Sequence, residues 1–200
     1  MMKQIPYGIT DFSRIQKENY YYVDKTMFIE KIEMQPPYLF LIRPRRFGKS
    51  LTLAMLEAYY DVNHAEQFDE LFGQLYIGQH PTKLHNQFLI MRFNFSEVSS
   101  NVNEVELSFK LHCCSKLKDF VFKYEDLLGK EIWDVLDEKI QEEPGAFLSA
   151  INSYATRKKN IRIYSLMNMI ISPIPFFRLT VRNFIGKQRM AKVLFVASLT

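Results

Sequence analysis

One unit of the sequence constrains the fold more than any other: an apolar strand pattern, a basic loop and an apolar helix in direct succession. Five apolar residues in a row, Tyr38 to Ile42, are typical of a central parallel strand covered on both faces. The loop RPRRFGKS follows at residues 43–50, and LTLAMLEAYY at residues 51–60 is apolar on nearly every side, which predicts a buried helix. This order predicts an α/β fold.

The rest of the chain alternates further helix and strand patterns. Before the unit we expect a short helix from Thr10 or Asp11, an aromatic strand Tyr20–Val23 and a helix capped by Asp24. After it the patterns predict a short helix His64–Phe72, a connecting loop Gly73–Pro81, a strand Phe88–Phe95, a long helix from Glu104 to Leu128, helices at 130–141 and 144–157, and a strand from Ile161 to Tyr164. Strands separated by helices predict a parallel sheet flanked by helices.

Composition narrows the class of protein. Two hundred residues, 48% hydrophobic and 24% charged, fit one globular domain, or one domain with a fragment of a second. No run approaches the ~18 apolar residues of a membrane span, and the N-terminus lacks the apolar core of an export signal. We therefore expect a cytoplasmic protein with no membrane partner. The adjacent Cys113 and Cys114 are poorly spaced for a disulfide or a zinc site, which predicts two reduced thiols.

Charge is divided unevenly along the chain. Residues 1–143 hold all 22 acids and 17 of the 26 basic residues, a balance of −5, whereas residues 144–200 hold the other nine basic residues and no acid. A purely basic tail would favour nucleic acid or a membrane surface as a partner.

The loop at residues 43–50 carries the chemistry. A phosphate-binding loop is G-x-x-x-x-G-K-[ST] between a strand and a helix: helix amides face the phosphates, the lysine reaches the β- and γ-oxygens, and the hydroxyl binds Mg²⁺. Gly48, Lys49 and Ser50 match this pattern, while Arg43 stands where the first glycine belongs. The alternative is a solvated basic turn, and the strand before the loop and the helix after it favour the phosphate site.

The arginines of the loop have two interpretations. Guanidinium groups of Arg43, Arg45 and Arg46 could clamp phosphate oxygens or contact the nucleotide of another subunit, or they could be surface charges that raise the local positive field. We favour a supporting role for Arg43 and leave the other two open.

Five segments of the chain, including the basic loop, form a recognisable set: IPYGITDF, YYYVDKTMFIEKI, YLFLIRPRRFGKSLTLAMLEAYYD, FDELFGQLYIG and FNFS. Together they resemble the N-terminal domain of the bacterial AAA-ATPase-like family, from about Ile5 to about Tyr164. The resemblance implies a P-loop NTPase domain that binds ATP and Mg²⁺, commonly joined in cis to a PD-(D/E)XK nuclease-like domain. Such a protein would meet nucleic acid only indirectly.

The resemblance also implies which residues contact the nucleotide. The candidate ATP-binding residues are Arg45, Arg46, Phe47, Gly48, Lys49, Ser50 and Leu51, with Ser50 also as the metal ligand. Asp24, Lys25 and Thr26 match the family's VDKT block, for which helix capping by Asp24 is the plain structural interpretation.

The acid that hydrolysis needs is missing. P-loop ATPases use an acidic group on a later strand, the Walker B function, to hold Mg²⁺ and orient water. In the resembling family that strand is similar to IYLLIDEYDNF, whereas here Ile161 to Leu166 is followed by MNMIIS, which has no acid. The chain is then either a degenerate pseudo-ATPase or the product of a reading-frame shift near Ser165.

The genetic code favours the frame shift. Methionine has the single codon ATG, so some codons of the frame that starts one base upstream are fixed by the printed sequence. In that frame the codon that spans Met167 and Asn168 must encode glutamate, the next must encode tyrosine or histidine, and the codon that spans Met169 and Ile170 must encode aspartate. The forced pattern E-[YH]-D fits the family's DEYDNF. We therefore predict an incomplete P-loop domain at residues 1–164, truncated after the strand that should carry Walker B, and an out-of-frame tail without native fold at residues 165–200. No catalytic residue is assigned, and we expect nucleotide binding without hydrolysis.

Overall fold

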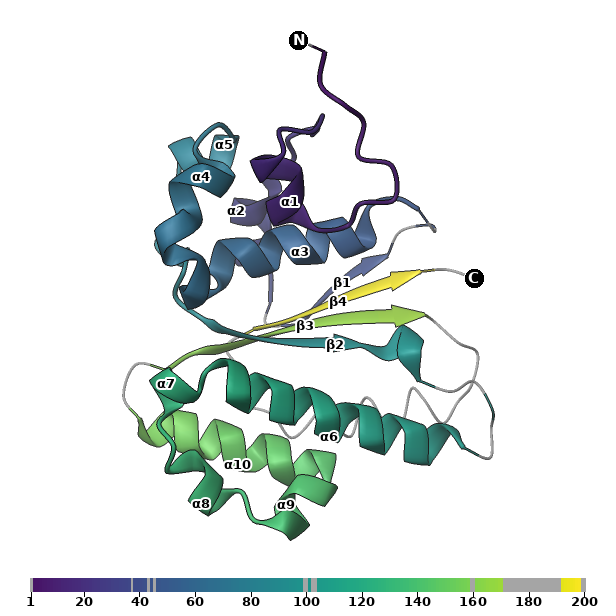
Figure 1. Cartoon of the computed structure of the whole chain (residues 1–200), viewed down its shortest axis with the longest axis vertical. Coiled ribbons are helices and arrows are strands. Elements are labelled where there is room, and N and C mark those ends of the chain that lie inside the picture. The colour runs from purple at the N-terminus through teal and green to yellow at the C-terminus, as the bar shows by residue number, and fades with distance from the viewer. Residues whose placement is uncertain are drawn as a thin grey trace.

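In the described residues a four-stranded parallel sheet lies between two layers of helices (Figure 1). The computed structural model describes residues 2–36, 38–42, 44, 46–98, 101, 104–158, 161–170 and 192–198. The strands are β1 (Tyr38–Ile42), β2 (Leu89–Asn94), β3 (Ile163–Ile170) and β4 (Lys192–Ser198), and their order across the sheet is β1-β4-β3-β2. The predicted α/β class with a parallel sheet is confirmed.

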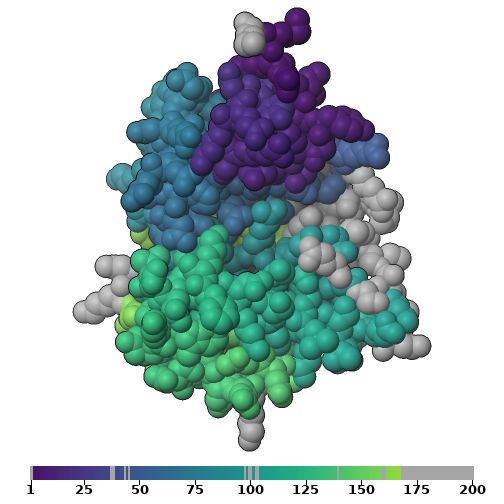
Figure 2. Space-filling model, viewed as in Figure 1, coloured from purple at the N-terminus to yellow at the C-terminus, as the bar shows by residue number. Residues whose placement is uncertain are grey.

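The helices divide by sequence between the two faces of the sheet (Figures 1 and 2). One face carries α1 (Phe12–Lys17), α2 (Phe28–Glu33), α3 (Lys49–Tyr60), the 3-10 helix η1 (Val62–Gln67), α4 (Phe68–Phe72) and α5 (Tyr76–Gln79). The other face carries α6 (Val105–Lys123), α7 (Glu125–Leu128), α8 (Ile132–Val135), α9 (Glu138–Glu142) and α10 (Pro144–Arg157), and the 3-10 helix η2 (Phe95–Glu97) follows β2.

Each face of the sheet has its own apolar core. Successive side chains of a strand point to opposite faces, so alternate residues of β3 enter different cores. Ile163 and Met167 pack in the cluster beneath α6 and α10, whereas Tyr164 and Leu166 pack in the cluster beneath α3. Both faces of β3 are therefore buried from Ile163 to Met167.

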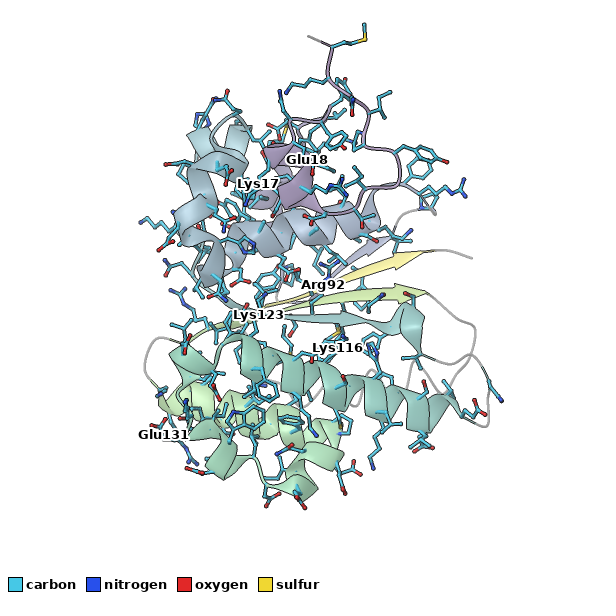
Figure 3. All side chains as sticks on the ribbon, in the orientation of Figure 1. Lys17, Glu18, Arg92, Lys116, Lys123 and Glu131 are labelled. Carbon is cyan, nitrogen blue, oxygen red and sulfur yellow. The ribbon has the colours of Figure 1, made fainter. Side chains whose placement is uncertain are left out.

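Among the described strands β2 is the last of the sheet, and polar groups from both helix layers lie along its outer edge. The hydroxyl of Tyr124 accepts a hydrogen bond from the amide of Ile90 at 2.8 Å, which satisfies an outward-facing donor of the edge strand. Beside it Arg92 pairs with Glu57 of α3 at 2.8 Å, and Lys123 at the end of α6 lies 3.2 Å from the same carboxylate (Figure 3). Charged side chains at an edge oppose pairing with another chain.

Several predicted elements are confirmed by the structure. Asp11 caps α1 by accepting a hydrogen bond from the amide of Arg14 at 3.1 Å. The apolar helix after the basic loop is α3, and β2 lies within the predicted Phe88–Phe95. The strand before the loop is β1, but its predicted central place, covered on both faces, was wrong: among the described strands β1 stands at one end of the order, and its Phe40 and Ile42 side chains are exposed. Pro144 occupies the first turn of α10, where its missing N–H costs nothing.

Asp24 caps a different helix from the one predicted. Helix α2 begins at Phe28 and has no side-chain cap. The Oδ2 atom of Asp24 instead accepts from the amide of Tyr76 at 2.7 Å, at the start of α5, and its Oδ1 accepts from the amide of Thr26 at 2.8 Å. The assignment of Asp24 to the next helix was therefore wrong, because the carboxylate finds its partner 52 positions along the chain.

Other boundaries differ where tertiary contacts interrupt a periodic pattern. The long predicted helix breaks at Tyr124 into α6 and α7, because this residue turns its hydroxyl to β2. The predicted helix 130–141 is two pieces, and Asp137 caps the second through the amide of Ile140 at 2.8 Å. The predicted loop Gly73–Pro81 contains α5, the predicted helix from His64 is η1 followed by α4, and residues 20–23 belong to no strand.

The last part of the described chain contributes two adjacent strands. β3 continues beyond the predicted end at Tyr164 as far as Ile170, so the predicted domain boundary falls inside this strand. Residues 192–198 form β4, which the sequence patterns did not predict and which lies between β1 and β3. The origin of residues 165–200 in another frame is a property of the gene and stays a prediction.

Candidate functional site

The basic loop after β1 ends in a left-handed glycine. Gly48 has φ +69° and ψ +21°, a conformation that side chains other than hydrogen disfavour. A Cβ atom at this position would meet nothing within 4 Å, so backbone conformation, and not space, requires glycine here. Arg46, two residues earlier, also has a positive φ, +65°. These two turns bring the chain from β1 directly into α3.

Helix α3 begins without a side-chain cap. Gly48 is its N-cap residue, and the first amides of any helix lack acceptors inside the helix. The carbonyl of Gly48 accepts from both the amide of Thr52 at 2.8 Å and the hydroxyl of Thr52 at 2.9 Å, which fixes the turn against the first helical residues. The N-terminus of α3 therefore has the fixed backbone and the positive dipole end that favour an anion.

The side chain of Lys49 turns back toward the loop that precedes α3. Its ammonium group donates a hydrogen bond to the carbonyl oxygen of Pro44 at 2.9 Å, in an exposed contact. Ser50 and Leu51 are half-buried, and Leu51 packs at the margin of the core beneath α3. The ammonium charge is thereby held on the same side of α3 as the loop that precedes it.

Most of the predicted nucleotide-binding residues fall within the described chain. Arg46, Phe47, Gly48, Lys49, Ser50 and Leu51 follow one another through the turn into α3, and the side chains of Arg46 and Phe47 are exposed. Arg43 and Arg45 lie outside the described residues.

The VDKT block of the sequence has a structural task. Thr26 is fully buried, its hydroxyl donates to Asp24 at 2.7 Å, and it accepts from the amide of Ile77 at 3.1 Å. With the bond from Tyr76 to Asp24, the two side chains satisfy the first two amides of α5. The block ties the N-terminal segment to α5, a link between distant segments that no local signal in the sequence could reveal.

The donors at the carboxyl edge of the sheet do not fit a Mg²⁺ ion. Mg²⁺ in nucleotide sites is held by one or two carboxylates together with phosphate oxygens. The four strands end at Ile42, Asn94, Ile170 and Ser198, none of which is acidic. In the described part of the chain no group of three or more His, Cys, Asp or Glu side chains is placed to hold a metal ion. The hydroxyl of Ser50 is the metal ligand that the loop pattern provides, without a carboxylate to accompany it.

Comparison with known proteins gives one family and one partial relative. The family model described as "Predicted AAA-ATPase" matches residues 6–170. An "uncharacterized protein in vnfD 5′ region" of Azotobacter chroococcum mcd 1 is 51% identical over 55 residues, which are 27% of this chain and 11% of that protein. The match therefore spans about a tenth of the length of this curated relative. No solved structure matches the chain.

Among the described helices, none has both the length and the apolar character that crossing a membrane requires.

Proposed function

Because this chain belongs to the predicted AAA-ATPase family, we propose that the loop between β1 and α3 binds ATP. Family membership implies a nucleotide-binding P-loop fold, and the described chain has the strand, the turn and the helix in that order. Two adjacent features support the proposal most: Gly48 has a left-handed backbone conformation, and the ammonium group of Lys49 contacts the loop at the carbonyl of Pro44. An anion bound there would meet helix amides and a positive charge together.

Each residue of the loop has a proposed role. Gly48 turns the backbone, the first amides of α3 donate to phosphate oxygens, and Lys49 exchanges its bond to Pro44 for the β- and γ-phosphates. This exchange costs little, because the contact with Pro44 is exposed and water can satisfy the carbonyl. The remaining proposed contacts come from Arg45, Arg46, Phe47, Ser50 and Leu51.

A binding titration tests the proposal. A fluorescent ATP analogue should bind the full chain, and Lys49→Ala should weaken binding about 10- to 150-fold, because a charged hydrogen bond contributes about 1.5–3 kcal/mol. Lys130→Ala is a matched control, since Lys130 is an exposed lysine beyond α7 in the other helix layer. Equal affinity of Lys49→Ala and the unaltered chain would contradict the proposal.

A second candidate, a binding module without hydrolysis, is favoured by one observation. No Asp or Glu occurs after Glu143, so neither β3 nor β4 brings a carboxylate to the edge where the phosphate loop begins. P-loop ATPases need such a group to hold Mg²⁺ and orient water. Phosphate release from ATP by this chain is therefore expected to stay at background. Hydrolysis would belong to a complete relative, whose proposed partner is a nuclease-like domain in cis.

The proposed cause of the missing acids is a shift of reading frame near Ser165. It is supported by the forced E-[YH]-D pattern across Met167 to Ile170 and by the purely basic composition that follows Glu143. Sequencing the gene across these codons to the next stop tests it. The proposal is supported if the reading frame that starts one base upstream is open and encodes the acidic strand. Stop codons in that frame contradict it. The basic tail would then have no nucleic-acid partner, and we propose the cytoplasm as the location of the chain.

A further inference from the structure

We infer that this site binds nucleoside polyphosphates without Mg²⁺, with protein cations in place of the metal. The inference rests on the proposed nucleotide binding and concerns what neutralises the phosphates. In P-loop ATPases that task is shared between the lysine and a metal ion held by a carboxylate. In this chain Lys49 is present, but neither β3 nor β4 contains an Asp or Glu that could hold the metal.

The register of the sheet shows which residues stand beside the start of the loop. Ile42, the last residue of β1, pairs with Ala197 of β4, and Ala197 pairs with Met169 of β3. The next residues along these two strands, Ser198 and Ile170, pair with each other. Ligands of parallel α/β sheets bind outside the carboxyl ends of the strands. At the carboxyl ends of β4 and β3 these residues are a serine and an isoleucine, and neither is acidic.

The acid of α3 is too far from Lys49 to replace the missing group. In α3 the first acid after Lys49 is Glu57, eight residues on, which is roughly 12 Å along the helix at 1.5 Å per residue. Glu57 is also paired with Arg92 and Lys123.

The charge balance at the loop favours the metal-free ligand. Lys49 and Arg46 carry positive charge at the turn, and α3 has no acid in its first turn. Free ATP carries two more negative charges than its Mg²⁺ complex, so the charges of Lys49 and Arg46 attract it at least as strongly. A site with a carboxylate has the opposite preference, because the metal must screen that acid from the phosphates.

The test is a titration of the full chain with ATP in two buffers of equal ionic strength, one with excess Mg²⁺ and one with EDTA. The unaltered chain and Lys49→Ala are measured in both, so that only binding through the loop is counted. We expect the Kd in EDTA to be equal to or below the Kd in Mg²⁺. The loss on Lys49→Ala should be at least as large in EDTA, since the ammonium then has no metal to share the charge.

The outcomes separate this inference from the proposed function. Binding that depends on Lys49 in both buffers, with a Kd in EDTA no more than about threefold above that in Mg²⁺, supports the inference. Binding that depends on Lys49 but weakens by more than about threefold in EDTA overturns the inference and leaves the proposed function standing. Absence of Lys49-dependent binding in both buffers overturns the proposed function and the inference with it.

Discussion

The substitution Lys123→Met tests how the buried carboxylate of Asp61 is stabilised. The Asp61 side chain is fully buried at the end of α3, and the Lys123 ammonium lies 2.8 Å from its Oδ2 atom. Contact with the Asp61 and Glu57 carboxylates outweighs burial and raises the pKa of Lys123, so the ion pair persists at neutral pH. Methionine keeps most of the apolar stem of lysine and removes only the charge, which leaves Asp61 buried without its cation.

The magnitude follows from the burial of the two partners. Removing one partner of a buried ion pair costs about 3–5 kcal/mol. Because the Lys123 side chain is 36% exposed, we take the low end, about 3 kcal/mol of unfolding free energy. For a chain of this size the loss corresponds to a fall in Tm of about 6–12 °C. Urea denaturation of the variant and the unaltered chain, with thermal melts in parallel, measures both quantities.

Helix α6 supplies a matched control. Lys116 is a lysine on the same helix with a similarly exposed side chain, 35%, and it pairs with Asp119 at 3.2 Å (Figure 3). The Asp119 side chain is 62% exposed, so Lys116→Met should cost less than about 0.5 kcal/mol. The double variant Asp61→Asn with Lys123→Met removes both charges and should recover most of the loss. A loss below about 1 kcal/mol for Lys123→Met alone would refute the reasoning.

Two further predictions concern the N-terminal segment. Thr26→Val should lower the unfolding free energy by about 1–3 kcal/mol in urea denaturation, because the Ile77 amide loses its acceptor and Asp24 loses a donor, whereas Thr26→Ser should retain most of the stability. A cost below about 0.5 kcal/mol for Thr26→Val would show that the bonds to α5 are dispensable. Burial, with the Asp24 carboxylate nearby, raises the pKa of Tyr22 to about 12 from 10.0, so the folded state holds its proton longer than the unfolded chain. This contribution is complete below pH 10.0 and is lost as the pH rises toward about 12, at a slope of up to about 1.4 kcal/mol per pH unit. Tyr22→Phe removes this contribution, so the unfolding free energy of the variant should fall less steeply between pH 10.0 and about 12. Parallel plots of unfolding free energy against pH for the two proteins would contradict the prediction.

Local sequence patterns gave the parts of the fold whose causes are local. The apolar run Tyr38–Ile42 became β1, the apolar stretch after the loop became α3, and Asp11 and Pro144 marked helix starts by their own chemistry. Patterns failed where a distant contact interrupts a helix, as at Tyr124, whose hydroxyl serves β2. β4 was missed because its apolar stretch, residues 193–197, lies in the basic segment that was expected to have no fold.

The sequence alone determined the loop that is proposed to bind phosphate and the lack of any Asp or Glu after Glu143, since both are statements about which residues are present and in what order. Gly48, Lys49 and Ser50 are neighbours in the chain, so their proximity needs no tertiary information. The tertiary structure decided which strand pairs with β1, which helix Asp24 caps and which lysine contacts Asp61. These partners are 52 and 62 positions apart in the last two cases, and only the packing of the helix layers on the sheet brings them into contact.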